Sequence, residues 1–179
     1  MPLRMGARLF RRVGGTVVSG ALSVPDARIA GMVMCDYFSA SGDDAAVSVL
    51  DRPGGPDASA FDVVPLKGID PVVVMARLEA ILTGCTYDEA TRRPRAGQLI
   101  SSPEAESAFI VSVSDTVQEA LASAAHASLA EAAGPWSETD ELRASGIPSE
   151  TALQVLVLLS ALAGRARAAG ERLYCWWAL

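Results

Sequence analysis

Hydrophobic residues recur along the chain with two different spacings, and these spacings predict a mixture of strands and helices. Bulky aliphatic and aromatic residues gather at 32–39 and at 173–179, which predicts a strand near each end of the chain, and a shorter extended segment is expected at 61–64. Apolar residues three and four positions apart predict long helices at 70–84, 114–133 and 149–169. First and last strands often pair, so we expect an α+β fold, in which a small mixed or antiparallel sheet includes both strands and packs with several helices.

Cap and turn residues predict where the helices begin and end. Asp70 followed by a proline is typical of a helix N-terminus, and Gly84 is typical of a left-handed C-cap. Pro135-Trp136 is expected to break the chain and to place the tryptophan between a loop and a short acidic helix. Residues 105–113 fit either a helix or a strand, because a Ser-Pro-Glu helix start precedes an alternating apolar run.

Charge divides the chain into a basic extension and an acidic body. Residues 1–31 carry five arginines and one aspartate, a net charge of +4, whereas the remaining residues carry 10 basic and 20 acidic side chains, a net charge of −10. We predict a poorly ordered extension at 1–31, or one that results from a misassigned start codon before Met32. A targeting segment and a folded part of the domain are the alternatives. Residues 32–179 are expected to form one globular domain, which is long enough to bury its own core.

Composition also argues against several classes of partner. An acidic body repels a phosphate backbone, so no nucleic acid is expected. No segment reaches the roughly 20 apolar residues of a membrane span, so no membrane is expected either. Three cysteines without a C-x-x-C pair support neither a disulfide framework nor a zinc site, and we expect buried thiols in a reducing cytoplasm.

The sequence contains no recognisable set of catalytic residues. The single histidine, His126, has no second histidine or cysteine at metal-ligand spacing, and we expect it on the solvated side of its helix. Neither a G-x-S-x-G nucleophile turn nor a glycine-rich phosphate loop occurs. Acidic pairs such as Asp43-Asp44 fall in expected first helical turns, where they complement the helix dipole. The sequence thus predicts no catalytic residue, no cofactor and no metal.

Aromatic residues and one lysine are the candidate binding residues. Alternation along the last strand puts Tyr174 and Trp176 on one face and Trp177 on the other. Lys67, the single lysine, precedes a predicted helix N-terminus. Core packing accounts for most aromatic rings, but tryptophan is also enriched at pockets and interfaces. The residues predicted to bind are Tyr37, Lys67, Trp136, Tyr174 and Trp176.

Three short motifs resemble those of a bacterial domain family. The aromatic strand Y-F-S-A at 37–40 leads into a Ser/Asp-capped short helix, and residues 78–84 carry the helix ending L-x-x-x-L-T-G. The last helix ends on A-A-G at 168–170, before the terminal strand. Over about residues 32–179 the chain therefore resembles the YfbM-like domains. The resemblance implies a shared fold and no known activity.

Two functions of different classes fit these features. The leading hypothesis is a non-enzymatic binding or protein-interaction domain, in one form an immunity-type or antitoxin-type protein whose acidic surface covers a basic toxin. The alternative is an enzyme or small-ligand binder that uses a carboxylate- and tyrosine-lined pocket. This alternative predicts one concave site that joins Tyr37, Lys67 and either Tyr174 or Trp176.

Overall fold

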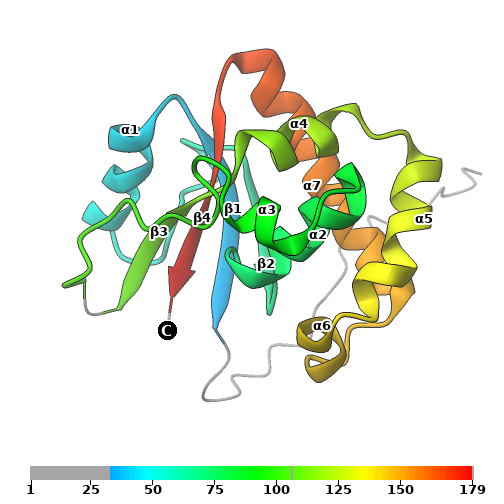
Figure 1. Cartoon of the computed structure of the whole chain (residues 1–179). Coiled ribbons are helices and arrows are strands. Elements are labelled where there is room, and N and C mark those ends of the chain that lie inside the picture. The colour runs from blue at the N-terminus through cyan, green and yellow to red at the C-terminus, as the bar shows by residue number, and fades with distance from the viewer. Residues whose placement is uncertain (1–32, 106, 179) are drawn as a thin grey trace, which may run out of the picture.

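A four-stranded antiparallel sheet lies between two unequal layers of helices (Figure 1). The computed structural model describes residues 33–105 and 107–178, so the extension predicted at 1–31 lies outside the described residues. In neighbour order the strands are β2 (Val63–Lys67), β1 (Met34–Ala40), β4 (Arg172–Ala178) and β3 (Ala108–Ser112). The predicted α+β fold is confirmed, and the two predicted terminal strands, β1 and β4, are neighbours at the centre of the sheet.

The segment that fitted either a helix or a strand forms β3, at one edge of the sheet. The chain just before β3 bridges its outer side. Ile100 N–H donates to the carbonyl of Ile110 at 2.9 Å, and Ser112 N–H donates to the carbonyl of Gln98 at 2.8 Å. The Ser-Pro-Glu signature makes only a turn. Main-chain pairing with β4, which is distant in the sequence, therefore makes this segment a strand, although its local sequence also fits a helix.

Side chains alternate across β4 as predicted. Leu173 and Cys175 are buried among the residues of the larger helical layer, and Trp177 packs against the same cluster. Tyr174 and Trp176 belong to a second cluster on the opposite face of the sheet. The sheet thus separates two hydrophobic cores, because successive side chains of a strand point to opposite faces.

The larger helical layer is built around α7 (Ser149–Ala169). Its buried residues recur every three or four positions, at 152, 155, 156, 159, 162, 163 and 166. By length and composition alone α7 qualifies as a membrane span, but in this fold its buried face forms the centre of the core. The other elements are α2 (Val73–Thr83), α3 (Tyr87–Thr91), α4 (Asp115–Ser123), α5 (His126–Ser137) and α6 (Asp140–Ala144) in the same layer, and α1 (Asp43–Val47) with the 3₁₀ helix η1 (Ser48–Asp51) on the other face (Figure 1).

The long helix predicted at 114–133 is wrong, because the chain forms two helices there. Two alanines between α4 and α5 have extended backbone conformations. Side chains of α7 satisfy the carbonyls at the end of α4: the Ser160 hydroxyl donates to Leu121 O at 2.8 Å, and Arg167 Nη2 donates to Ala122 O at 3.1 Å. These caps lie about forty residues away in the sequence, so local helix propensity did not reveal the break.

The chain break predicted at Pro135-Trp136 is also wrong, because α5 continues through both residues to Ser137. A proline inside a helix leaves one carbonyl, here that of the exposed Glu131, without its helical donor. Trp136 compensates, since it is fully buried and its indole Nε1 donates to the carbonyl of Val74 in α2 at 3.2 Å. Tertiary packing therefore keeps α5 intact where local preference predicts a loop.

Candidate ligand-binding cleft

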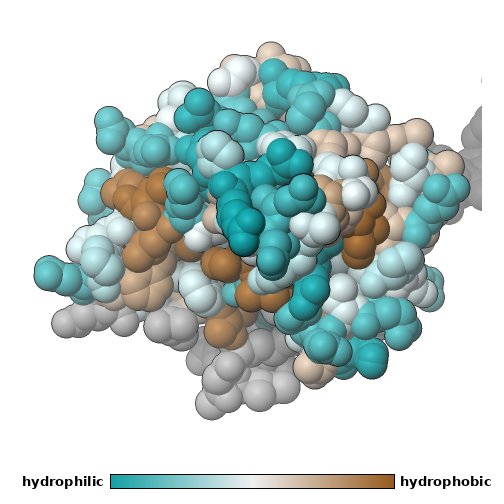
Figure 2. Space-filling view, in the orientation of Figure 1, coloured by the Kyte–Doolittle hydropathy of each residue, from teal (hydrophilic) through white to brown (hydrophobic). Residues whose placement is uncertain are grey.

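A cleft of about 450 Å³ lies at the end of the sheet where β1 begins and β4 ends. Three parts of the chain meet there: the central strands, the turn between β2 and α2, and the connection between α6 and α7. Its apolar wall consists of Val33, Cys35, Ile147 and Trp177. Hydrophobic residues reach the surface near the lower end of β1 in Figure 2. Small-molecule sites typically measure roughly 300–1,000 Å³ and are mostly apolar, so the cleft has the size and lining of a ligand site.

The turn between β2 and α2 supplies the polar side of the cleft. Gly68 has a φ of 73°, a left-handed conformation that favours glycine, and it reverses the chain just after Lys67. Ile69 is buried, and its carbonyl accepts a hydrogen bond from the Tyr37 hydroxyl at 2.8 Å. Asp70 Oδ1 then accepts from the main-chain N–H groups of Val72 and Val73 at 2.9 and 2.5 Å, which holds the turn in place. The helix start predicted at Asp70 is early, because α2 begins at Val73 and its N-cap residue is Val72.

Trp177 lines the cleft and has a buried indole N–H group without an acceptor. Its indole Nε1 is buried, and within residues 33–105 and 107–178 no acceptor contacts it. Such a buried donor typically destabilises a fold by about 1–3 kcal/mol. The indole of Trp136, in contrast, has the carbonyl partner described above. Trp177 therefore lines the cleft with its ring, while its N–H group is buried away from the open space.

Asp70 brings a carboxylate to the cleft, whereas alternation along β2 directs the Lys67 side chain to the opposite face of the sheet, which also carries Asp36. Lys67 is exposed at the end of β2, whereas Asp70 is partly buried. Lys67 also acts on Asp36 in β1, since burial raises the pKa of this carboxyl group and the ammonium group of Lys67 opposes the rise. The hydroxyl of Ser145, at the end of α6, lies 3.9 Å from the position that a Cβ at residue 68 would occupy. The polar groups thus converge from two segments onto one side of the cleft.

The structure separates the residues that were predicted to share one site. Tyr37 is fully buried on the face of the sheet that α7 covers. Tyr174 and Trp176 lie on the opposite face, in the cluster that includes residues of α1 and η1. Of the predicted set, Lys67 alone lines the cleft. The single site joining these residues is therefore wrong, because the sheet lies between its two tyrosines.

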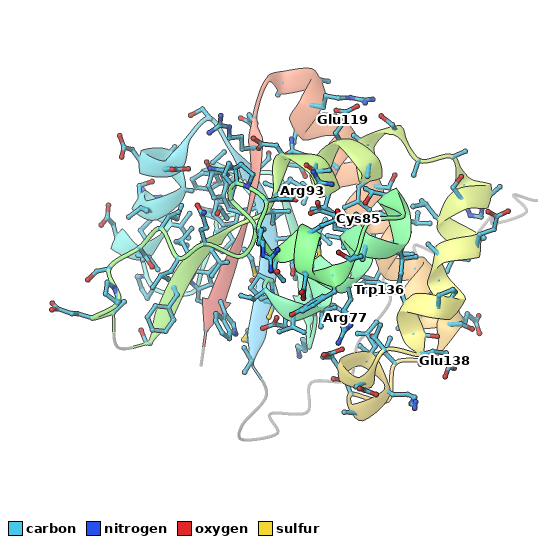
Figure 3. All side chains as sticks on the ribbon, viewed as in Figure 1. Arg77, Cys85, Arg93, Glu119, Trp136 and Glu138 are labelled. Carbon is cyan, nitrogen blue, oxygen red and sulfur yellow. The ribbon has the colours of Figure 1, made fainter. Side chains whose placement is uncertain are left out.

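Trp136 and Trp176 serve mainly in packing. Trp136 lies between α5 and α2 (Figure 3). Trp176 is 8% exposed, and a Cβ at Gly55 would be 3.0 Å from its ring carbons, so only glycine allows this close approach. Two cavities of about 620 and 350 Å³ border the same loop, and their charged residues include the exposed Asp51 and Arg52. Within the described chain, no buried unpaired polar group lines these cavities, which distinguishes them from the cleft.

A cluster around Arg95 joins α1, α4 and β4. Arg95 is the one non-glycine residue with positive φ, 65°, in the described part of the chain, and its side chain is 11% exposed. Its guanidinium lies 2.9 Å from Asp43 and 3.3 Å from Asp115. The Tyr174 hydroxyl donates to Asp43 at 2.8 Å. This hydrogen bond, followed by the one from Arg95, lowers the pKa of Asp43. Every charge of the cluster has a partner, so we interpret it as structural.

A second cluster holds the carboxylate of Glu79, which is 1% exposed. The Ser114 hydroxyl donates to it, and Arg93 Nε lies 2.6 Å from its Oε1 (Arg93 is labelled in Figure 3). The only histidine, His126, begins α5 and is exposed. Among the side chains that the structure describes, no group of three potential ligands is arranged to hold a metal ion. These clusters connect helices and loops and contain no paired nucleophile and base.

Sequence reasoning missed the part of the cleft that Trp177 and Ser145 contribute. Alternation along β4 correctly separated Trp177 from its aromatic neighbours, but it carries no information on which face contains a cavity. Ser145 and Ile147 follow a short helix, and nothing in their local sequence indicates proximity to β1. Asp70 was identified in the sequence as a helix cap. The turn after β2 also makes it a lining residue of the cleft, which the sequence did not reveal.

Comparison of the chain with protein-family models, with curated proteins and with solved structures gave no match. The resemblance to the YfbM-like domains and the cytoplasmic location therefore stay predictions. Any inference about function depends on the geometry of the described residues.

Proposed function

We propose that this protein is a non-enzymatic binding domain whose ligand occupies the cleft between the sheet end and the α6–α7 connection. The observation that supports the proposal most is a cavity of ligand size whose wall of Val33, Ile147 and the Trp177 ring is apolar. Asp70 adds a carboxylate, and the turn that carries it is anchored by the hydrogen bonds of Asp70 and of Tyr37. Anchored polar groups on an apolar wall are typical of a binding site.

The same residues give little support to catalysis. One oxygen of Asp70 accepts two main-chain hydrogen bonds, so this carboxylate serves the backbone just before α2. The Cys35 thiol is buried, and no histidine lines the cleft to act as its base. A binding domain requires neither a base nor a nucleophile, which makes it the simpler conclusion.

A substitution that fills the cleft tests this proposal. Ser145 is exposed at the end of α6, so Ser145→Trp should occupy the cleft without disturbing the core, and Ser145→Ala is the matched control. Both full-length variants would be used as baits in native lysate, with bound small molecules and proteins identified by mass spectrometry. A species retained by Ser145→Ala and lost from Ser145→Trp supports the proposal. Identical profiles, or chemical conversion of the retained species by the purified protein, would refute it.

A protein partner is the second candidate, because the helix that ends at the cleft begins with exposed acidic side chains. Exposed Glu138 and Asp140 lie at the start of α6, the helix whose other end supplies Ser145 (Glu138 is labelled in Figure 3). We infer that a basic partner of the immunity or antitoxin type would contact these acids while one of its side chains enters the cleft. The combined change Glu138→Gln and Asp140→Asn should then weaken capture of that partner at low salt. Unchanged capture would contradict this form of the function.

A further inference from the structure

We propose that the outer face of α7 binds the same face of a second copy of this chain, as an antiparallel helix pair about a twofold axis. The inference goes beyond the proposed function, because the cleft ends at Ile147, before α7 begins. Its basis is an apolar helix face that is open to solvent, with opposite charges at its two ends. Twofold pairing of identical surfaces is the commonest form of oligomer in soluble proteins.

α7 is apolar on its outer side as well as on its buried side. Only 39% of an 18-residue apolar window of this helix is buried. Val157 is 38% exposed and Leu158 is 47% exposed, and Ala161 and Ala168 on the same side of the helix are exposed as well. A surface helix normally carries polar or charged side chains on its outer side, so we expect another apolar surface to cover this one.

The outer positions of α7 follow the spacing of a coiled-coil seam. Steps of four and three residues alternate along the helix, and positions with this spacing form one stripe. The residues of this stripe, which we call the seam, are Glu150, Gln154, Val157, Ala161, Gly164 and Ala168. A Cβ at Gly164 would contact no atom of another element of the described chain. The small residues at 161, 164 and 168 therefore leave room for a second helix to approach closely.

The charges at the ends of α7 favour a second copy in antiparallel orientation. No charged residue occurs from 151 to 164, whereas exposed Glu150 lies in the first turn and exposed Arg165 and Arg167 lie near the end. A twofold axis near position 159, midway along the seam, brings Glu150 of each copy close to the arginines of the other copy. A parallel pair would instead place the two Glu150 carboxylates together. Antiparallel helix dipoles also attract each other.

Arg165 remains available for this contact although it pairs with Asp62. Its side chain is 55% exposed, and a guanidinium has five N–H donors, so it can bind a second carboxylate. A membrane surface fits the same face less well, because the chain has a net charge of −6 and anionic lipids would repel it.

The size of the seam predicts a dimer that dissociates on dilution. Residues 150–168 extend about 28 Å along the helix axis, and the contact is one helix wide, roughly 10 Å. Stable protein interfaces bury about 800 Å² on each partner. A single helix face is smaller than this, which places the expected interface among the weaker ones.

Sedimentation velocity of the full chain at a series of loading concentrations tests the inference. We expect a monomer–dimer equilibrium whose dissociation constant rises at least about tenfold in Leu158→Glu, because two carboxylates would be buried near the twofold axis. Leu99→Glu is the matched control, since Leu99 is similarly exposed but lies beside β3, and it should associate like the parent chain. A monomer at every concentration, with or without binding to phosphatidylglycerol vesicles, would overturn the inference, as would unchanged association of Leu158→Glu.

Charge reversal tests the antiparallel orientation. Glu150→Arg and Arg165→Glu each place like charges at both ends of the pair, so each variant alone should dimerise about tenfold more weakly than the parent chain. An equimolar mixture of the two variants should recover the association of the parent, because opposite charges then meet at both ends of the mixed dimer. A mixture that associates no better than either variant alone would overturn the antiparallel pairing. Thermal unfolding checks that both variants are folded, which is expected because both positions are exposed.

Discussion

Arg93→Met should destabilise the protein more than Glu79→Gln, although both substitutions break the same ion pair. The Glu79 side chain is 1% exposed and the Arg93 side chain is 36% exposed, with 2.6 Å between Oε1 and Nε. Removal of the arginine leaves a buried carboxylate whose other partner is the hydroxyl of Ser114. We expect this change to lower the free energy of unfolding by about 3 kcal/mol. Glu79→Gln instead leaves a guanidinium that water can solvate, so we expect a loss of about 1–2 kcal/mol.

Thermal and urea unfolding of the two variants and their combination measure this asymmetry. In a chain of this length 1 kcal/mol corresponds to a change in Tm of about 2–4 °C, so Arg93→Met should lower Tm by about 6–12 °C and Glu79→Gln by about 2–8 °C. The double variant should be more stable than Arg93→Met alone, because glutamine needs no counter-charge. Equal losses for the two single variants, or additive losses in the double variant, would refute the argument that burial of the carboxylate dominates.

Three further predictions concern other parts of the fold. The lowered pKa of Asp43 means that its ionised form stabilises the protein above the ordinary value of 3.8, so Asp43→Asn should lower stability at pH 7. This difference should disappear as pH falls through the lowered pKa, which urea unfolding of both proteins over a descending pH series can measure. Gly55→Ala should lower the free energy of unfolding by about 1 kcal/mol more than Gly54→Ala. Both glycines have positive φ, but only Gly55 lies against an indole ring. Equal Tm values for the two variants would contradict this contact. Trp136→Phe should lower the free energy of unfolding by about 2 kcal/mol, because a hydrogen bond is lost and a space is left in the core. A loss below about 0.5 kcal/mol would show that α5 does not depend on this residue.

Most elements could be predicted because their signals are local. The alternation along β4 and the three- and four-residue spacing along α7 depend only on how a strand or a helix orders its own side chains. The left-handed C-cap Gly84 acts locally as well and marks the end of α2 in the sequence and in the structure, whereas α2 begins at Val73, three residues after the predicted N-cap Asp70. The same reasoning failed at 114–133, since the groups that end α4 belong to α7.

The candidate site depended much more on tertiary structure. Lys67 was a candidate from its sequence position, and the structure does bring it to a cleft. Tyr37 and Tyr174 were grouped with it because they are aromatic and lie near chain ends, but the sheet puts them on opposite faces. Whether an aromatic ring on a strand packs in a core or lines a cavity depends on the layer that covers it, and that layer comes from distant segments.

The sequence by itself determined most of the element types, the α+β class and the C-cap of α2, because each follows from the geometry and hydrogen bonding of a few neighbouring residues. Only the tertiary structure decided that α5 passes through Pro135, that β3 is a strand, and that the cleft joins Trp177 to a turn more than one hundred residues earlier. The physical reason is the same in each case. Burial and hydrogen bonding between distant segments contribute several kcal/mol, which exceeds local preferences of roughly 1 kcal/mol or less for most residues.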